Sequence, residues 1–208
     1  MLRPVPTRED KPVSVESVYA LSKYDQETLC LVAGRAYGVE TVALRLFNTY
    51  GPRQALSNPY TGVIAIFASR LLNGRPPLLF EDGMQRRDFV AVRDVARALV
   101  LALVTPGAAG QILNIGSGVS QSVRDVATRL ASATGRPTIA PLVTGKCRVG
   151  DVRHCFADVT RARKVLGYAP TVAFEDGLAE LSAWLGNEVA LDRVAEASAE
   201  LEARGLSL

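Results

Sequence analysis

Tyr19 and Lys23 are two residues whose types and spacing could perform acid-base chemistry. They lie four positions apart in the run Ser17-Val-Tyr-Ala-Leu-Ser-Lys23. On a helix such a pair shares one face, so the phenol and the ammonium can reach the same reacting centre. A nearby cation favours the phenolate, the form that acts as a general base. Alone, the pattern more often marks a solvated lysine beside a half-buried tyrosine, so the rest of the chain must decide.

A helix followed by a buried strand is expected to position this pair. Ser14 or Ser17 can cap a helix that runs to the stop signal Tyr37-Gly38. The apolar run 41–47 suits a strand of a parallel sheet. Because ligands in open α/β sheets bind beyond the carboxyl ends of strands, chemistry is expected at Asn48-Thr-Tyr-Gly-Pro-Arg53.

Strand and helix patterns alternate through the rest of the chain. Strands are expected at 78–80, 86–92 and 111–115, and helices at 63–72, 94–104, 122–135, 160–166 and 174–185, with Asp94 and Ser122 as caps. The tail, 187–204, reads as an amphipathic helix that packs on the rest. The alternation predicts an α/β fold.

Composition excludes several classes of protein. The 208 residues are 48% hydrophobic, and 24 basic residues are scattered among 21 acids, so we expect no nucleic-acid partner. No apolar stretch has the length of a signal peptide core or a membrane span, which predicts a cytoplasmic protein without a membrane partner. Cys30, Cys147, Cys155 and the single histidine, His154, lack the spacing of metal ligands, so we expect reduced thiols and no metal.

Five short stretches carry a resemblance to a known family. In chain order they are Tyr19-x-x-x-Lys23, Arg45-Leu-Phe-Asn-Thr-Tyr-Gly-Pro52, Asp82-Gly-Met-Gln-Arg-Arg-Asp-Phe89, Asn114-Ile-Gly-Ser-Gly118, and Arg148-Val-Gly-Asp151 with Ala157-Asp158. Together they closely resemble the extended short-chain dehydrogenase/reductase family of NAD-dependent nucleotide-sugar epimerases and dehydratases. The resemblance covers roughly residues 10 to 186, and within the family the sequence is most similar to the 4-epimerases.

The resemblance implies a reaction. Tyr19 would take the proton from the sugar C4 hydroxyl as hydride passes to NAD+, and Lys23 would hold the nicotinamide ribose. Leu46 and Phe47 match positions beside the nicotinamide. A 4-keto sugar would turn over in the pocket and regain the hydride on its other face, which inverts C4.

The resemblance also implies a site for a UDP- or dTDP-linked sugar. Its residues would be Asn48, Arg87 and Arg148 near the diphosphate, Asp151 near the nucleotide, and Leu78 and Phe80 around the base. Four of them have an ordinary alternative. Asn48 could be only a turn residue and Phe80 only core; Arg87 could pair with Asp88 or Glu81, and Arg153 could replace Arg148. We interpret 114–118 as a turn on the substrate side, because it lacks G-x-G-x-x-G spacing.

The chain departs from the family in one respect: no G-x-x-G-x-x-G phosphate loop precedes Tyr19. We therefore expect the C-terminal part of a Rossmann-type doubly wound domain plus a small mixed α/β substrate lobe. Residues 1–60 would belong to the former, 61–186 mainly to the latter, and 187–208 to a helical tail. A truncated gene, a half supplied by another polypeptide and a binding remnant all remain open.

Three functions therefore stay under consideration. The first is an NAD-dependent nucleotide-sugar 4-epimerase, which would form a homodimer once its Rossmann half is complete. The second is a 4,6-dehydratase, whose additional acid/base pair commonly lies in the upstream half. The third is a module that binds sugar nucleotides without turning them over.

Overall fold

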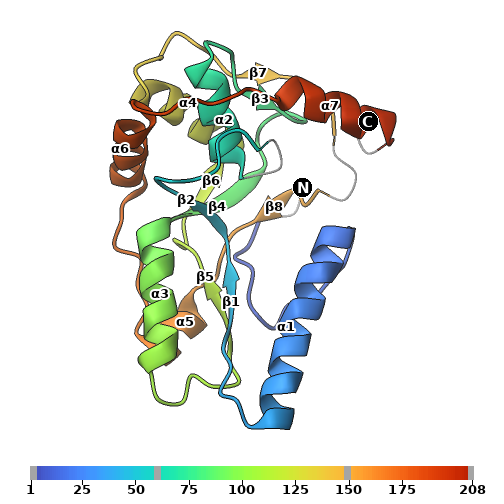
Figure 1. Ribbon diagram of the computed structural model, residues 1–208, viewed down its shortest axis with the longest axis vertical. Coiled ribbons are helices and arrows are strands. Elements are labelled where there is room, and N and C mark those ends of the chain that lie inside the picture. Colours follow the sequence, from blue (N-terminus) through green and yellow to red (C-terminus); the bar gives the residue numbers. More distant parts are fainter. Residues whose placement is uncertain (1–3, 59–61, 148–150, 206–208) are drawn as a thin grey trace.

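The computed structural model describes residues 4–58, 62–147 and 151–205, and Figure 1 shows them as an α/β arrangement. The helices are α1 (Val18–Tyr37), α2 (Val63–Leu72), α3 (Val92–Val104), α4 (Val123–Ala133), α5 (Thr160–Leu166), α6 (Phe174–Leu185) and α7 (Val194–Ala203). The strands are β1 (Ala43–Leu46), β2 (Asn48–Tyr50), β3 (Leu78–Leu79), β4 (Arg86–Ala91), β5 (Ile112–Ile115), β6 (Ser120–Ser122), β7 (Leu142–Val143) and β8 (His154–Cys155).

The helix that carries Tyr19 forms as the sequence predicts. The hydroxyl of Ser17 accepts a hydrogen bond from the Ala20 amide at 3.1 Å and so caps the first turn. Gly38 ends α1 in the left-handed conformation, at φ 68°. Both ends of α1 are therefore set by local sequence.

The strands divide into separate sheets. In the first, β1 lies parallel to β5, with Ala43 opposite Ile112. In the second, β4 pairs with parallel β2 and β8 and with antiparallel β6, while β3 and β7 form a short parallel pair. Asn48, for which a turn residue was the ordinary alternative, begins β2 opposite Phe89. That alternative does not hold, because the chain stays extended and passes directly into the second sheet.

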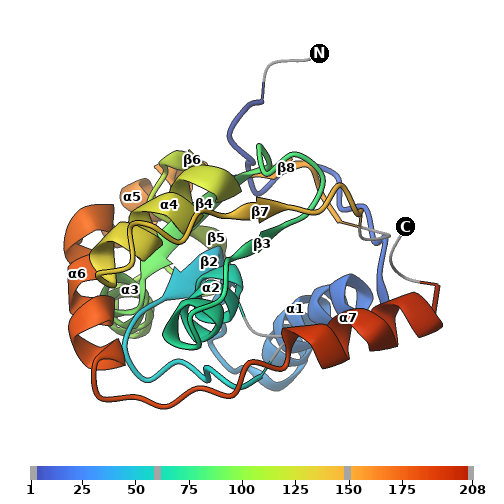
Figure 2. The same ribbon diagram turned by 90° about the horizontal axis from the view of Figure 1, so that it is seen from above.

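Two hydrophobic clusters correspond to the two parts visible in Figure 1. The lower cluster joins β1 and β5 with α3 and α5, through side chains such as Leu113, Ile115 and Ala162. The upper cluster joins β2 and β4 with α2, α4 and α6, through side chains such as Phe67 and Leu130. Figure 2 shows the helices of the upper cluster gathered around β2 and β4.

Asp94 does not cap α3. Ala91 occupies the N-cap position, and the buried Asp94 carboxylate accepts hydrogen bonds from the Thr171 amide and hydroxyl and from the Val172 amide, at 2.8–3.1 Å. The residue therefore holds the segment before α6 rather than its own helix. Ser122 caps α4 as predicted, since its hydroxyl accepts from the Asp125 amide at 3.0 Å.

The turn after β5 wraps a buried carboxylate. Asp88 in β4 accepts hydrogen bonds from the Ser117 amide at 2.7 Å, the Ser117 hydroxyl at 2.6 Å and the Gly118 amide at 2.8 Å. A Cβ at Gly116 would lie 2.6 Å from the Asp88 carboxylate, so this close approach requires glycine. The 114–118 turn thus joins the two clusters through Asp88.

Among the described residues, no helix is both long and apolar enough to cross a membrane.

Candidate functional site

A cavity of about 270 Å³ lies in the upper part of the molecule. Its polar lining comes from Asn48 at the start of β2, Gln85 and Arg87 at the start of β4, and Asp151. Three of these were named from the family resemblance, Asn48 and Arg87 near the diphosphate and Asp151 near the nucleotide. The fold brings them together from distant parts of the chain.

The rest of the cavity lining is apolar. Leu78 and Phe80 contribute to it, as the sequence predicted for the wall around a base. The remaining apolar residues come from the loop before α2 and from helices: Gly62, Val63, Ile66, Phe67, Val123, Val194 and Ala197. Sequence reasoning missed these, although the helical spacing of Val63, Ile66 and Phe67 marks a single apolar face of α2.

Arg87 is the cation of this cavity, and its guanidinium is held in place. Its Nη1 donates to the Arg86 and Arg153 carbonyls at 3.0 Å, and its Nη2 donates to the Asp151 carboxylate at 3.0 Å. The Arg87 side chain is largely buried. Asp88, one of the two alternative partners of Arg87, binds the 114–118 turn instead. The acid that pairs with Arg87 is Asp151, which itself lines the cavity.

The other alternative partner of Arg87, Glu81, pairs with Arg153. The Arg153 guanidinium also donates to both carboxylate oxygens of Asp82, at 2.7 and 2.8 Å. Hydrogen bonding to Arg153 holds the Asp82 pKa well below its usual range. Arg153 therefore fastens the turn between β3 and β4 and is not free to replace Arg148. Arg148 lies outside the described residues.

Gln85 is a cavity residue that sequence reasoning did not single out. Its side-chain amide nitrogen donates to the Phe80 carbonyl at 2.9 Å, which fixes the backbone of the predicted base wall. Gln85 and Arg87 are two positions apart at the start of a strand, so their side chains leave the same face. That period-2 spacing was the signal for Gln85.

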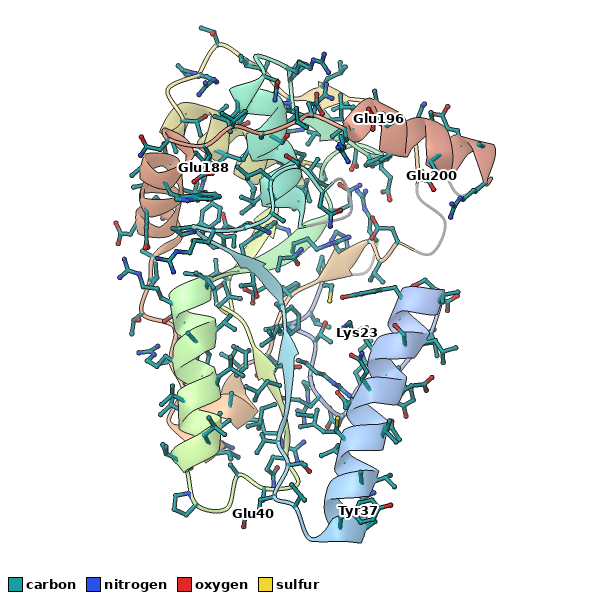
Figure 3. The ribbon with its side chains drawn as sticks, in the orientation of Figure 1. Lys23, Tyr37, Glu40, Glu188, Glu196 and Glu200 are labelled. Carbon is teal, nitrogen blue, oxygen red and sulfur yellow. The ribbon has the colours of Figure 1, made fainter. Side chains whose placement is uncertain are left out.

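Tyr19 and Lys23 lie close together on α1. The Lys23 ammonium is 5.8 Å from the centre of the Tyr19 ring, and it donates to the Gln26 side chain at 3.1 Å. Tyr19 is 71% exposed. Figure 3 shows Lys23 on the side of α1 that faces β1. Neither residue is part of the cavity lining, so the structure pairs them with each other but not with Arg87.

Leu46 and Phe47 stand at the carboxyl end of β1. Leu46 is about half exposed, while Phe47 packs on the lower hydrophobic cluster and its amide donates to the Ile115 carbonyl at 3.0 Å. Both residues lie outside the cavity lining. Their place at the end of a parallel strand suits a cofactor contact, and that role stays a prediction.

Within the described part of the chain, no group of three or more His, Cys, Asp or Glu side chains is arranged to hold a metal ion.

The profile of the NAD dependent epimerase/dehydratase family matches residues 2–116. The chain belongs to this family. A dTDP-L-rhamnose 4-epimerase from Burkholderia thailandensis is 39% identical over 191 residues, which are 91% of this chain and 51% of the relative. A dTDP-glucose 4,6-dehydratase from an Actinoplanes species is 36% identical over 177 residues, covering 85% of this chain and 53% of that relative.

A solved structure supports the same assignment. The chain matches the crystal structure of UDP-glucose 4-epimerase from Thermotoga maritima, determined with UDP-glucose, at a TM-score of 0.79 and 35% identity. The match covers 89% of this chain and 59% of that protein. The mixed α/β fold of the family is thereby confirmed, and the chain spans about half the length of the curated relatives it matches.

Proposed function

We propose that this chain is the substrate-binding portion, with the catalytic helix, of an NAD-dependent nucleotide-sugar 4-epimerase. The observation that carries the proposal is the convergence of Asn48, Leu78, Phe80, Arg87 and Asp151 on one cavity, whose lining is partly charged and partly apolar. A nucleoside diphosphate has the same division, since its base presents flat apolar faces and its diphosphate is anionic.

The ligand would lie along this division. The base packs between Leu78 and Phe80, and the diphosphate reaches Arg87 and Asn48, because a guanidinium can donate two parallel hydrogen bonds to phosphate oxygens. Arg148 would add a further diphosphate contact. A volume of about 270 Å³ lies just below the usual range for small-molecule pockets, about 300–1,000 Å³, so it suits the nucleotide part. The sugar then extends out of the cavity.

The catalytic pair would act on the sugar at that point. The N-terminal end of α1, which carries Tyr19, is directed toward the upper cluster in Figure 1. Tyr19 removes the C4 hydroxyl proton and later returns it, while the Lys23 ammonium stabilises the phenolate. The resulting 4-keto sugar turns over between the two proton transfers, and C4 inverts.

The residues of this chain fit one end of an NAD molecule. The Lys23 ammonium has three donors and uses one of them on the Gln26 side chain, and Leu46 is exposed at the end of β1, so these residues can contact the nicotinamide ribose and ring. Bound NAD+ supplies the hydride acceptor for C4. The 208 residues contain no G-x-x-G-x-x-G loop for the pyrophosphate. We therefore assign that end to a dinucleotide-binding half outside these residues.

The completed enzyme would be a cytoplasmic homodimer. Val18, Leu29 and Val32 are exposed apolar residues on α1, and an exposed apolar helix face of this kind favours association. Sedimentation of the completed protein at several concentrations tests this; a monomer at all of them would contradict it.

Titration calorimetry with UDP and dTDP tests the proposed site on the 208-residue chain. Arg87→Ala should weaken binding by about 10- to 100-fold, because a hydrogen bond to a charged group contributes roughly 1.5–3 kcal/mol. Arg86→Ala is the matched control, since Arg86 donates to Ser120 and its side chain leaves the opposite face of β4. Equal affinities for the two variants would reject the site.

A nucleotide-sugar 4,6-dehydratase is the second candidate, supported by the 36% identity to the Actinoplanes enzyme. Dehydration removes one water from the sugar, whereas epimerisation leaves its mass unchanged. Mass spectrometry of the product from the completed protein separates the two. A third outcome, nucleotide binding without turnover in the completed protein, would identify a binding module.

A further inference from the structure

The segment that follows α6 lies beyond the five motifs, yet it forms part of the cavity wall. Figure 1 shows it running from α6 past α2 to α7. Val194 and Ala197 are three positions apart on α7 and both line the cavity. Ala197 is 7% exposed, whereas Ala195 and Ala199 are exposed. One face of α7 is therefore turned into the cavity and another into solvent.

The link from α6 to α7 is fixed to the upper cluster through its backbone. The Asn73 side chain donates to the Ala190 carbonyl at 2.8 Å. The Ser69 hydroxyl donates to the Leu191 carbonyl at 3.3 Å, and the Leu191 amide donates to the Ser57 hydroxyl at 3.0 Å. These bonds set the point from which α7 begins.

A buried carboxylate fixes the start of α7 itself. Asp192 has a side chain that is only 2% exposed, and it accepts hydrogen bonds from Arg70 at 3.3 Å and Arg75 at 2.9 Å. Its other oxygen accepts from the Val194 amide at 3.1 Å, at the first residue of the helix. Because a buried charge is costly without partners, this arrangement resists displacement of the helix start.

The far end of α7 contacts the segment that follows β7. Glu202 forms an ion pair with Lys146 in that segment. The β7 strand pairs with β3, with Leu142 opposite Leu78, and Leu78 is a cavity residue. The helix is thus held near its start by α2 and near its end by the segment after β7, and both α2 and β3 contribute residues to the cavity.

The chemistry of the wall indicates what it contacts. Val194 and Ala197 add only apolar surface to a lining that also contains Leu78 and Phe80, whereas Arg87 and Asp151 supply the charges. We propose that α7 is a wall of the nucleotide pocket that packs on the base, and that the small side chain of Ala197 leaves the space for it. This inference rests on the proposed function.

Calorimetry with UDP and dTDP on the full 208-residue chain tests the inference with a matched pair of variants. Ala197→Trp should raise the Kd at least tenfold, because the indole occupies the space of the base. Ala199→Trp places the same side chain on the exposed face of the same helix and should leave the Kd within twofold. Circular dichroism melting checks that each variant folds. If Ala197→Trp does not fold, Ala197→Val takes its place, with an expected rise of about threefold.

The outcomes separate the inference from the proposed function. If Arg87→Ala weakens binding but Ala197→Trp and Ala199→Trp bind as the unchanged chain does, the site stands and the α7 wall is overturned. If the unchanged chain binds neither UDP nor dTDP, both are overturned. If Ala197→Trp weakens binding and Ala199→Trp does not, the result supports α7 as a wall of the nucleotide pocket.

Discussion

The two helices α1 and α2 differ sharply in how their side chains are covered. Seven of the ten residues of α2 are buried, including Phe67 at 1% exposure, and they pack against α4 and the second sheet. In the twenty residues of α1 only Leu31 and Gly34 are buried, and Leu29 is 68% exposed. The part that would bind the sugar nucleotide has a closed core, and the part that would bind the cofactor does not. Substrate binding and catalysis are therefore expected to depend differently on the dinucleotide-binding half that we propose lies outside these residues.

The largest effect should come from removing the phenol hydroxyl of Tyr19 on the exposed helix α1. In the chain completed with a dinucleotide-binding half, Tyr19→Phe should lower turnover about 10²- to 10⁴-fold, because general base catalysis contributes that much. Tyr24→Phe, on the same helix, is the control and should retain turnover. Steady-state kinetics measure both, and near-normal turnover of Tyr19→Phe would remove it from the mechanism.

Core substitutions test the contrast in burial directly. Phe67→Ala in α2 should lower the free energy of unfolding by about 3–5 kcal/mol, since it leaves a cavity in a closed core. Leu29→Ala in α1 should change it by less than about 0.5 kcal/mol, because the side chain is exposed. Urea unfolding gives both values. Similar losses of unfolding free energy in the two variants would mean that α1 is covered by other residues in solution.

A smaller effect is expected at the carboxylate that joins the two clusters. Asp88→Asn should lower the free energy of unfolding by about 2–3 kcal/mol, because an amide cannot accept all the N–H donors that Asp88 now satisfies. Asp25→Asn on exposed α1 is the matched control and should be nearly neutral. An unchanged free energy of unfolding in Asp88→Asn would argue against Asp88 as the link between the two clusters.

The smallest effect should be a pH dependence of the free energy of unfolding that comes from His154 in β8. Burial, then the charges of Arg153, Arg87 and Arg86, lower the pKa of His154 below its ordinary 6.5. Its Nδ1 accepts a hydrogen bond from the Arg86 amide at 3.2 Å, which requires the neutral ring. The unfolded chain then binds the proton more readily, so this stability is full above pH 6.5 and declines as the pH falls below it.

His154→Gln is the control for that pH dependence. The chain has one histidine, so the variant should lose the part of the slope below pH 6.5 that belongs to His154. Thermal unfolding of both proteins across this range measures the difference. Identical slopes would show that the imidazole does not titrate as expected.

Elements with strong local signals were predicted well from the sequence. The bounds of α2, α5 and α6 agree with the structure, and the caps Ser17, Gly38 and Ser122 act as expected. These features depend on neighbours in the chain, through helical periodicity and capping hydrogen bonds. The convergence of Leu78, Phe80 and Arg87 on one cavity was expected from the family resemblance.

Other features could not be read from local sequence because tertiary contacts decide them. Asp94 resembles a helix cap, but its carboxylate accepts a hydrogen bond from Thr171 in a distant segment instead. Asn48 resembles a turn residue, but pairing with Phe89 in β4 keeps it extended. The amphipathic pattern of the tail predicted that α7 packs, but not that Ala197 reaches the cavity.

The continuous extended segment from β1 into β2 has a mechanical consequence. Arg45 and Leu46 belong to one sheet and Asn48 to the other, so a single residue, Phe47, separates them. A relative rotation of the two sheets would have its shortest covalent path through this peptide. Strain from a ligand bound at Asn48, as we propose, would therefore be transmitted to β1 within one residue.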